Sequence, residues 1–403
     1  MTDILVVGVG PAGLKTVLEL LKRGYDGEII LFEEHKEIGR PVHCSGVVSL
    51  KGLKSFYLKE MSNRYIQNYV SGAKIFFPNG KSLFVKANRN VATIIDRRLF
   101  DLSLYYKVID KGIPVRKNNK VVDIGIKNNK FRILVRDGSK GSISYESEKV
   151  ILATGVNDIL SQKIGFGKNE KVVPSLQYEV EGVKDLDEDV VEIYIGSRYS
   201  RGLFAWIIPL GDNMARIGLA DLVNPLERLK YFIGKDPLVS YRITNLKIKS
   251  VLGGAVITSG SKKELYKTFE RPIFLIGDSA GQTKPTTGGG IVLIGKAAEL
   301  LSESIISEKY GSYQKKWWQE MGNEILIQLF LRKFLDSLSD KELVDIFDIL
   351  KRGGFEEISV KIGEMDFQSR IIKKFGIKSF YLFLKHPRIL SKLFTVFIKT
   401  LFI

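Results

Sequence analysis

Short runs of uninterrupted apolar residues mark the first strands that the pattern of the chain predicts. Residues 4–7 and 29–32 are such runs, and two more, at 150–153 and 272–276, come far downstream. Runs of this length without polar alternation are typical of parallel strands that are buried on both faces. Between the first two runs, apolar positions recur at helical spacing over 14–21. The beginning of the chain therefore predicts a strand–helix–strand unit in a parallel sheet.

Alternating and helical patterns fill the rest of the chain. Residues 51–90 interrupt the parallel pattern with alternating stretches, and 117–147 indicate a meander of strands. Residues 166–260 predict antiparallel strands. The clearest of these strands are 190–195, 204–208 and 215–220. From 306 to 403 the apolar residues recur at helical spacing, so the chain predicts an α/β protein with two sheet domains and a helical end.

The turn after the first strand has the pattern of a dinucleotide-binding motif. It reads Gly8-Val9-Gly10-Pro11-Ala12-Gly13, and the second strand is followed by Glu33. The first glycine permits a tight turn, Gly10 lets the backbone approach a pyrophosphate, and Gly13 lets the helix lie close to the strand. The helix N-terminus presents unpaired N–H groups and the positive end of its dipole to the phosphates. Glu33 follows Gly13 by about 20 residues, where a carboxylate accepts the ribose hydroxyls, which favours FAD or NAD over NADP.

Two later segments favour FAD over NAD. The third apolar run leads to Gly155, and the fourth leads to Asp278, which places a carboxylate at the sheet edge where ligands bind. A glycine-rich loop follows, and its glycines begin a helix whose N-terminus can face an anion or a carbonyl-rich ring. The residues of this loop that we expect at the cofactor are Pro285, Gly288, Gly289, Gly290 and Ile291.

Composition excludes several classes of protein. The 403 residues include 44% hydrophobic and 27% charged residues, which is ordinary for a globular protein. One cysteine, Cys44, and three histidines exclude a disulfide framework and a zinc ribbon, so we predict no metal site. The net charge of +17 favours an acidic partner, but the lysines are dispersed, so we exclude nucleic acid. We recognise neither a signal peptide nor a membrane span and expect a cytoplasmic protein.

Three further motifs complete a resemblance to a known family. Residues 97–101 read Arg-Arg-Leu-Phe-Asp, residues 41–44 read Pro-Val-His-Cys, and residues 204–209 read Phe-Ala-Trp-Ile-Ile-Pro. With the nucleotide motifs, they resemble the FAD-dependent oxidoreductases of the glutathione-reductase-like superfamily, in the branch of para-hydroxybenzoate hydroxylase. The last two resemble the PxxCG and YxWxFP motifs of the geranylgeranyl reductases. The chain departs from these two motifs at Ser45, Phe204 and Ile208.

The resemblance implies a fold and its division into domains. It implies an α/β protein whose discontinuous, Rossmann-like FAD-binding domain covers residues 1–165 and 261–305, interrupted at about 51–90 by a segment of the substrate domain. Residues 166–260 would form an antiparallel-sheet substrate domain, and residues 306–403 a helical C-terminal region. The cofactor that the resemblance implies is FAD.

The resemblance also implies roles for individual residues. Cys44 is expected to lie near the flavin as the catalytic residue, while Lys284, in the flavin loop, is interpreted as a solvated charge with a role towards reduced flavin left open. The residues expected to contact FAD are Gly8, Gly10, Ala12, Gly13, Glu33, Cys44, Gly46, Arg97, Val121, Gly155, Asp278, Pro285, Gly288, Gly289, Gly290 and Ile291. The residues expected to contact the substrate are Phe204, Trp206, Ile208 and Pro209.

The activity that the resemblance implies is the reduction of isoprenoid double bonds. The substrate would be a geranylgeranyl chain of an archaeal-type prenyl lipid, and the electrons would come from ferredoxin or NAD(P)H. Such a reaction needs an apolar site, which the strand around Trp206 favours. Three alternatives stay open: a flavin monooxygenase acting on an aromatic or quinone, a reductase of a quinone's isoprenoid tail, and an electron-transfer subunit.

The end of the chain, residues 377–403, mixes basic and apolar positions at helical spacing. Because it is too charged to span a bilayer, it predicts an interfacial helix in peripheral contact with an anionic membrane. The other interpretation is a helix that packs on the protein's own core. Its aromatic positions include Phe394, Phe397 and Phe402.

Overall fold

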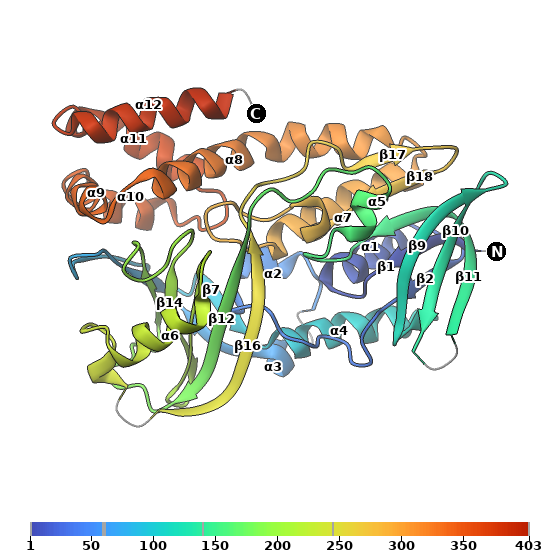
Figure 1. The fold of residues 1–403 in the computed structure, drawn as a ribbon, viewed down its shortest axis with the longest axis horizontal. Coiled ribbons are helices and arrows are strands. Elements are labelled where there is room, and N and C mark those ends of the chain that lie inside the picture. The colour runs from blue at the N-terminus through green and yellow to red at the C-terminus, as the bar shows by residue number, and fades with distance from the viewer. Residues whose placement is uncertain (1, 59–61, 139–140, 244–245, 402–403) are drawn as a thin grey trace.

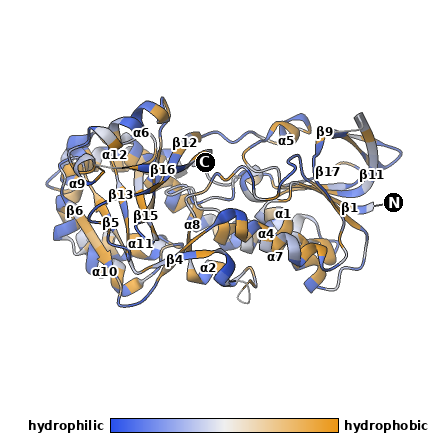
Figure 2. Ribbon diagram, turned by 90° about the horizontal axis from the view of Figure 1, so that it is seen from below, coloured by the Kyte–Doolittle hydropathy of each residue, from blue (hydrophilic) through white to orange (hydrophobic). Residues whose placement is uncertain are grey.

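The computed structural model describes residues 2–58, 62–138, 141–243 and 246–401. The fold has two large sheets, a small third sheet and a group of C-terminal helices (Figure 1). Seen from below in Figure 2, it forms two lobes, and apolar residues occur in the strands and helices of both.

The first sheet is built around the parallel strands that the apolar runs predict. β1 (Thr2–Val7) pairs in parallel with β2 (Ile29–Phe32) and with β11 (Gly141–Leu152), and β11 pairs in parallel with β18 (Pro272–Leu275). Every residue of β2 and β18 is buried, which confirms strands covered on both faces. The other members of this sheet are β8 (Val115–Arg116), β9 (Asn119–Lys127), β10 (Lys130–Asp137) and β17 (Tyr266–Thr268). This sheet and its helices form the half of the molecule that carries the predicted nucleotide-binding motif. The helices are α1 (Pro11–Lys22), α4 (Arg97–Ile109), α5 (Ile159–Lys163) and α7 (Ile291–Ile306).

The second sheet combines the predicted antiparallel region with the interrupting segment. Its strands are, in spatial order, β16 (Lys247–Ile257), β12 (Val172–Glu181), β15 (Met214–Ala220), β14 (Ala205–Gly211), β13 (Val190–Tyr194), β5 (Gly72–Phe76) and β6 (Ser82–Lys86). β5 pairs in parallel with β13, while the other pairs are antiparallel. Residues 72–86 therefore belong to this sheet, although they precede much of the nucleotide-binding half in sequence.

The two faces of β14 have different neighbours. Since successive side chains of a strand alternate, Ala205 and Ile207 pack with Phe232 of α6 (Pro225–Gly234), whereas Trp206 and Ile208 belong to another cluster on the opposite face. The third sheet connects the halves through β3 (Val47–Ser49), β7 (Ala92–Ile95) and β4 (Ile66–Val70). Two short helices accompany it, α2 (Leu50–Lys54) and α3 (Ser62–Tyr65).

Five helices close the chain and pack against both halves. They are α8 (Gly311–Ser337), α9 (Asp340–Arg352), α10 (Phe355–Ile362), α11 (Ser369–Phe383) and α12 (Pro387–Leu401). One apolar cluster joins Phe77 and Leu83, beside β5 and on β6, to Leu343 of α9 and Ile389 of α12. The α/β architecture with a helical C-terminus is confirmed; α9 and α10 contact β6 of the second sheet, and α8 contacts α7 and β17 of the first half.

Candidate active site

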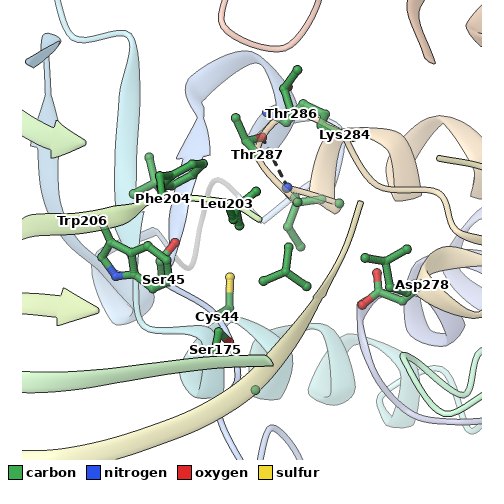
Figure 3. A pocket seen from close by; sticks show the side chains of 18 of the residues that line it. Cys44, Ser45, Ser175, Leu203, Phe204, Trp206, Asp278, Lys284, Thr286 and Thr287 are labelled. Atoms are coloured by element: carbon green, nitrogen blue, oxygen red, sulfur yellow. Dashed lines mark hydrogen bonds between the residues drawn. The ribbon is translucent and has the colours of Figure 1, made fainter. Parts of the chain in front are cut away.

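A large cavity lies between the first sheet, the second sheet and the C-terminal helices. Its volume is about 1770 Å³. At one end it borders the turn after β1, and at the other it borders apolar side chains of α8 to α11. Figure 3 shows its middle, where Cys44, Trp206 and Asp278 approach from three different elements.

The turn between β1 and α1 has the conformation of a phosphate-binding turn. Gly8 has a φ of +105°, and a Cβ there would lie 2.2 Å from the carbonyl oxygen of Ala153. A Cβ at Gly10 would meet nothing within 4 Å, because this glycine borders the cavity. α1 begins at Pro11 without a side-chain cap, so its N-terminal N–H groups are available to an anion.

Glu33 lies directly after β2 and lines the same end of the cavity. Its carboxylate accepts hydrogen bonds from the backbone N–H groups of Val9 and His35, each at 3.0 Å. These bonds hold the carboxylate beside the phosphate-binding turn, which is where the adenosine ribose of a dinucleotide requires an acceptor.

The facing wall of this end comes from β18 and α4. Asp278 borders the cavity, and burial raises the pKa of its carboxyl, an effect that the charge of Arg97 opposes. Arg97 forms an ion pair with Asp101, with Nη2 3.1 Å from Oδ1. Burial alone would lower the pKa of Arg97, but its interactions with Asp101 and Cys44 raise it. Arg97 is therefore a permanent cation beside both Asp278 and Cys44.

The glycine-rich loop before α7 narrows the cavity next to Asp278. Gly288 has a φ of +74°, and a Cβ there would lie 1.9 Å from Cγ1 of Val256, so only glycine fits. No side chain caps the N-terminus of α7, which begins at Ile291. The other predicted cofactor contacts that line the cavity are Ala12, Arg97, Val121, Gly155, Gly289, Gly290 and Ile291.

Four predicted contact residues, all within the described ranges, lie outside the cavity wall: Gly13, Gly46, Pro209 and Pro285. A Cβ at Gly13 would lie 2.2 Å from the carbonyl oxygen of Gly8, so Gly13 serves the packing of α1. Pro285 points towards the backbone turn at Gly260, where a Cβ would lie 3.7 Å from its Cγ. The packing role of Gly13 agrees with the motif, and contact of Gly13 or Pro285 with FAD stays a prediction.

The positions of the other two residues also have local causes. Gly46 has a φ of +83°, and a Cβ there would lie 2.4 Å from Nη1 of Arg216, so this glycine makes room for the arginine, and its contact with FAD stays a prediction. Pro209 is buried and shares the strand face of Ala205 and Ile207, which turn away from the cavity. Of the predicted substrate contacts, Phe204, Trp206 and Ile208 line the cavity, whereas Pro209 lies on the other face of the strand.

Cys44 is a free, half-buried thiol on the loop before β3. Its Sγ accepts a hydrogen bond from the N–H of Gly46 at 3.3 Å, and its carbonyl oxygen accepts one from Nε2 of Gln177 at 3.0 Å. The same amide accepts a hydrogen bond from Nε1 of Trp206 at 3.2 Å. Gln177 therefore connects the Cys44 loop to the substrate strand. Sequence analysis missed it because a single glutamine in a strand carries no motif.

Arg216 is a second residue that sequence analysis missed. It is 2% exposed, and its Nη1 donates to the carbonyl oxygens of Ser45 at 2.8 Å and Ile95 at 3.1 Å. Its Nε donates to Glu179 at 2.8 Å. These bonds hold the Cys44 loop against β12 and β15. The available signal was one arginine within the otherwise apolar run at 214–220.

Lys284 is not a solvated charge, contrary to the interpretation from the sequence. It is 8% exposed, and its Nζ donates to Oδ1 of Asp366 at 2.9 Å. Asp366 lies between α10 and α11, so its proximity to the glycine-rich loop depends on how the C-terminal helices fold back.

The helical end of the cavity is predominantly apolar. Sequence analysis treated residues 306–403 as a separate region, because helical spacing reveals an apolar face but not its neighbour. The apolar side chains that the helices contribute to the wall include Phe334, Leu343, Ile346, Phe375, Phe383 and Leu393. Across from them, Ile193, Trp206 and Ile208 line the wall from the second sheet. A cavity of this size and polarity fits a long hydrocarbon chain.

These features define an FAD-dependent oxidoreductase. The open space at Gly10 and at Gly155, where a Cβ would meet nothing within 4 Å, leaves room for the cofactor along the wall. Glu33 and the N-terminus of α1 fit the adenosine half of FAD, while Asp278 and the N-terminus of α7 fit the flavin half. Within the described ranges, no group of three or more His, Cys, Asp or Glu side chains is placed to hold a metal ion. Nor does that part of the chain contain a helix long and apolar enough to cross a membrane.

Comparisons with known proteins identify the family. Residues 2–189 match the family model described as pyridine nucleotide-disulphide oxidoreductase. Digeranylgeranylglycerophospholipid reductase 1 of Methanococcoides burtonii is 30% identical over 92% of this chain and 92% of its own length. The digeranylgeranylglycerophospholipid reductase of Methanosarcina acetivorans is also 30% identical, over 88% of this chain and 90% of its own. The chain therefore belongs to the geranylgeranyl reductase family.

A solved structure supports the fold. The geranylgeranyl bacteriochlorophyll reductase-like protein of Thermoplasma acidophilum matches with a TM-score of 0.79 over 98% of both chains. The two sequences are 22% identical, so this similarity concerns the fold alone.

Proposed function

We propose that this protein is an FAD-dependent reductase that saturates the isoprenoid double bonds of geranylgeranyl chains in archaeal-type prenyl phospholipids. The observation that carries the proposal is the cavity, which continues from the FAD-binding wall into an apolar chamber beneath the C-terminal helices. The names of the relatives from Methanococcoides burtonii and Methanosarcina acetivorans support the same substrate class.

Reduction of a carbon–carbon double bond adds a hydride to one carbon and a proton to the other. FAD, once reduced, supplies the hydride. The chain's own residues hold the alkene and exclude water, with Phe204, Trp206 and Ile208 forming an apolar wall. Cys44 places its Sγ in the same part of the cavity, and we assign it to contact and orient the reacting alkene. The electrons that reduce FAD come, in this proposal, from ferredoxin or NAD(P)H.

The reaction class can be tested on the purified protein. Anoxic incubation with digeranylgeranylglycerophospholipid and dithionite should yield lipids that are heavier by two hydrogens for each reduced double bond, as measured by mass spectrometry. Unchanged lipid masses would contradict the proposal. A product that gains oxygen in air from an aromatic or quinone substrate would identify a monooxygenase instead.

Cys44→Ser is expected to retain FAD while lowering prenyl reduction at least about tenfold, because a small misplacement of the reacting alkene has a large effect on rate. The substitution changes polarity and acidity with little change in volume. Flavin absorbance would report cofactor occupancy, and mass spectrometry would report turnover. Cys44→Ala provides the comparison, since a residue that merely packs would tolerate Ser and Ala alike. Full turnover in both variants would contradict a role for the thiol.

We also propose that the enzyme meets its lipid at an anionic membrane surface through α11 and α12. Both interpretations of residues 377–403 find support. α12 packs inward through Ile389 and Val396, and Nζ of Lys392 donates to Glu342 at 2.6 Å. At the same time, the two helices expose apolar side chains at the edge of the molecule (Figure 1). The exposed side chains are Ile377, Phe380, Tyr381, Leu384, Phe394, Phe397 and Ile398. Phe402 lies outside the described residues.

Exposed basic residues accompany this apolar surface and complement anionic lipid head groups. They are Lys373, Lys374, Lys378, Lys385, Arg388 and Lys399. Two of the helices' other side chains, Phe383 and Leu393, line the cavity, so a lipid that reaches this surface is close to the chamber.

Replacement of Ile377 and Leu384 by Ser is expected to weaken binding to anionic liposomes at least tenfold, because these side chains are 88% and 60% exposed and contribute apolar surface to the membrane contact. Co-sedimentation at low and high salt would measure the effect. The matched control replaces Val223 and Val251, which are 67% and 60% exposed elsewhere on the protein. Equal binding by the two double variants would place the membrane contact on another surface.

A further inference from the structure

We infer that Lys284 and Asp366 together set the reduction potential of the bound flavin. The inference concerns the FAD site that the proposed function uses, and it assumes nothing about the lipid substrate. It gives a role to a buried ion pair between the nucleotide-binding half and the C-terminal helices.

Lys284 closes the glycine-rich loop on itself. Its N–H donates to the carbonyl oxygen of Gly289 at 3.0 Å, and its carbonyl oxygen accepts from the N–H of Gly288 at 2.7 Å. The side chain then passes over Gly289, where a Cβ would lie 2.9 Å from Cε and 3.4 Å from Nζ. The ammonium group therefore lies at the glycines that lead into α7, and Lys284 lines the cavity with them.

Asp366 is held in place from two sides. Oγ of Ser49, at the end of β3, donates to its Oδ2, and Nε2 of Gln328, on α8, donates to its carbonyl oxygen at 3.1 Å. Asp366 is 4% exposed and also lines the cavity. Because both charges are withdrawn from water, their fields reach a neighbouring group with little screening.

The two charges act on reduced flavin in opposite directions. Two-electron reduction adds negative charge to the flavin, which a nearby cation stabilises and a nearby anion destabilises. Lys284 thus raises the potential, and Asp366 limits the increase. A tenfold change in the protein's relative affinity for reduced and oxidised flavin corresponds to about 30 mV for a two-electron couple.

The experiment measures the midpoint potential of the FAD-loaded protein by equilibration with redox dyes at one pH and ionic strength. Asp366→Asn is expected to raise the potential and Lys284→Met to lower it, each by at least the tenfold affinity change. The control is Lys296→Met on α7, because Lys296 is 34% exposed and forms an ion pair with Glu320 at 2.6 Å on the protein surface. The midpoint potential of FAD in the Lys296→Met variant should equal that of the unmodified protein.

Opposite shifts support the inference, since a purely structural link would not distinguish the sign of the charge removed. Shifts in the same direction, or none, would overturn it. If Lys284→Met does not retain FAD, the isosteric Asp366→Asn decides alone: an increase supports the inference, and an unchanged or lower potential overturns it. Because no lipid is present, failure of the proposed function in the mass-spectrometric assay would leave this result intact.

Discussion

Glu33→Arg is expected to yield a folded protein without FAD. The carboxylate borders the cavity and is held by the N–H groups of Val9 and His35, so an arginine there removes the acceptor for the ribose hydroxyls. Loss of charge-assisted hydrogen bonds of about 3 kcal/mol corresponds to roughly 100-fold weaker binding. Titration of the apoprotein with FAD, followed by fluorescence, would measure the change.

The matched control for this prediction is Glu37→Arg. Glu37 is 65% exposed and pairs with Arg40 on the surface, so the same change of charge close by should leave FAD affinity within about twofold. If Glu33→Arg retains flavin at the control's occupancy, Glu33 does not bind the ribose, and the nucleotide lies differently along the wall.

Ile346→Trp is expected to separate long substrates from short ones. Ile346 lines the helical end of the cavity beside the apolar cluster of Leu343 and Phe375, and an indole there would fill part of the chamber. Reduction of a twenty-carbon geranylgeranyl chain should fall at least tenfold, or about 1.4 kcal/mol, in kcat/KM. A ten-carbon geranyl chain should retain most of its activity, because it need not reach this end.

Lys341→Trp serves as the control, since Lys341 is exposed on the same helix. It should leave both substrates unaffected. Equal losses for long and short chains in Ile346→Trp would indicate a general loss of packing, and no loss for either would mean that the lipid does not enter the helical end. Flavin occupancy and thermal unfolding of each variant separate these outcomes from misfolding.

The nucleotide-binding half could be predicted from the sequence because its signals are local. Gly8, Gly10 and Glu33 sit at fixed distances along one strand–helix–strand unit, and the backbone conformation that such a turn requires admits few other residues. Asp278 and Gly288 could be predicted for the same reason. Asp278 follows the buried strand β18 closely, and Gly288 lies shortly before α7.

Some residues of the predicted site lie outside the cavity wall. Gly13 and Gly46 fit the cofactor motifs, yet the atoms that exclude a Cβ at these positions belong to Gly8 and Arg216 of the protein itself. Pro209 belongs to a substrate motif, but strand alternation turns it away from the cavity. A motif records that a small or rigid residue is required and does not state which neighbour requires it.

The sequence by itself determined the class of sheet and the FAD site along β1 and β2, because both depend on short-range backbone geometry and apolar periodicity. The position of Cys44 near that site was expected only from the family resemblance. Only the tertiary structure decided which distant segments meet at the site. Gln177 and Arg216 bind the Cys44 loop, Asp366 forms an ion pair with Lys284, and α8 to α11 line the apolar chamber. These contacts join segments far apart in the chain. Charge pairing and burial depend on distance in space, which periodicity along the sequence does not encode.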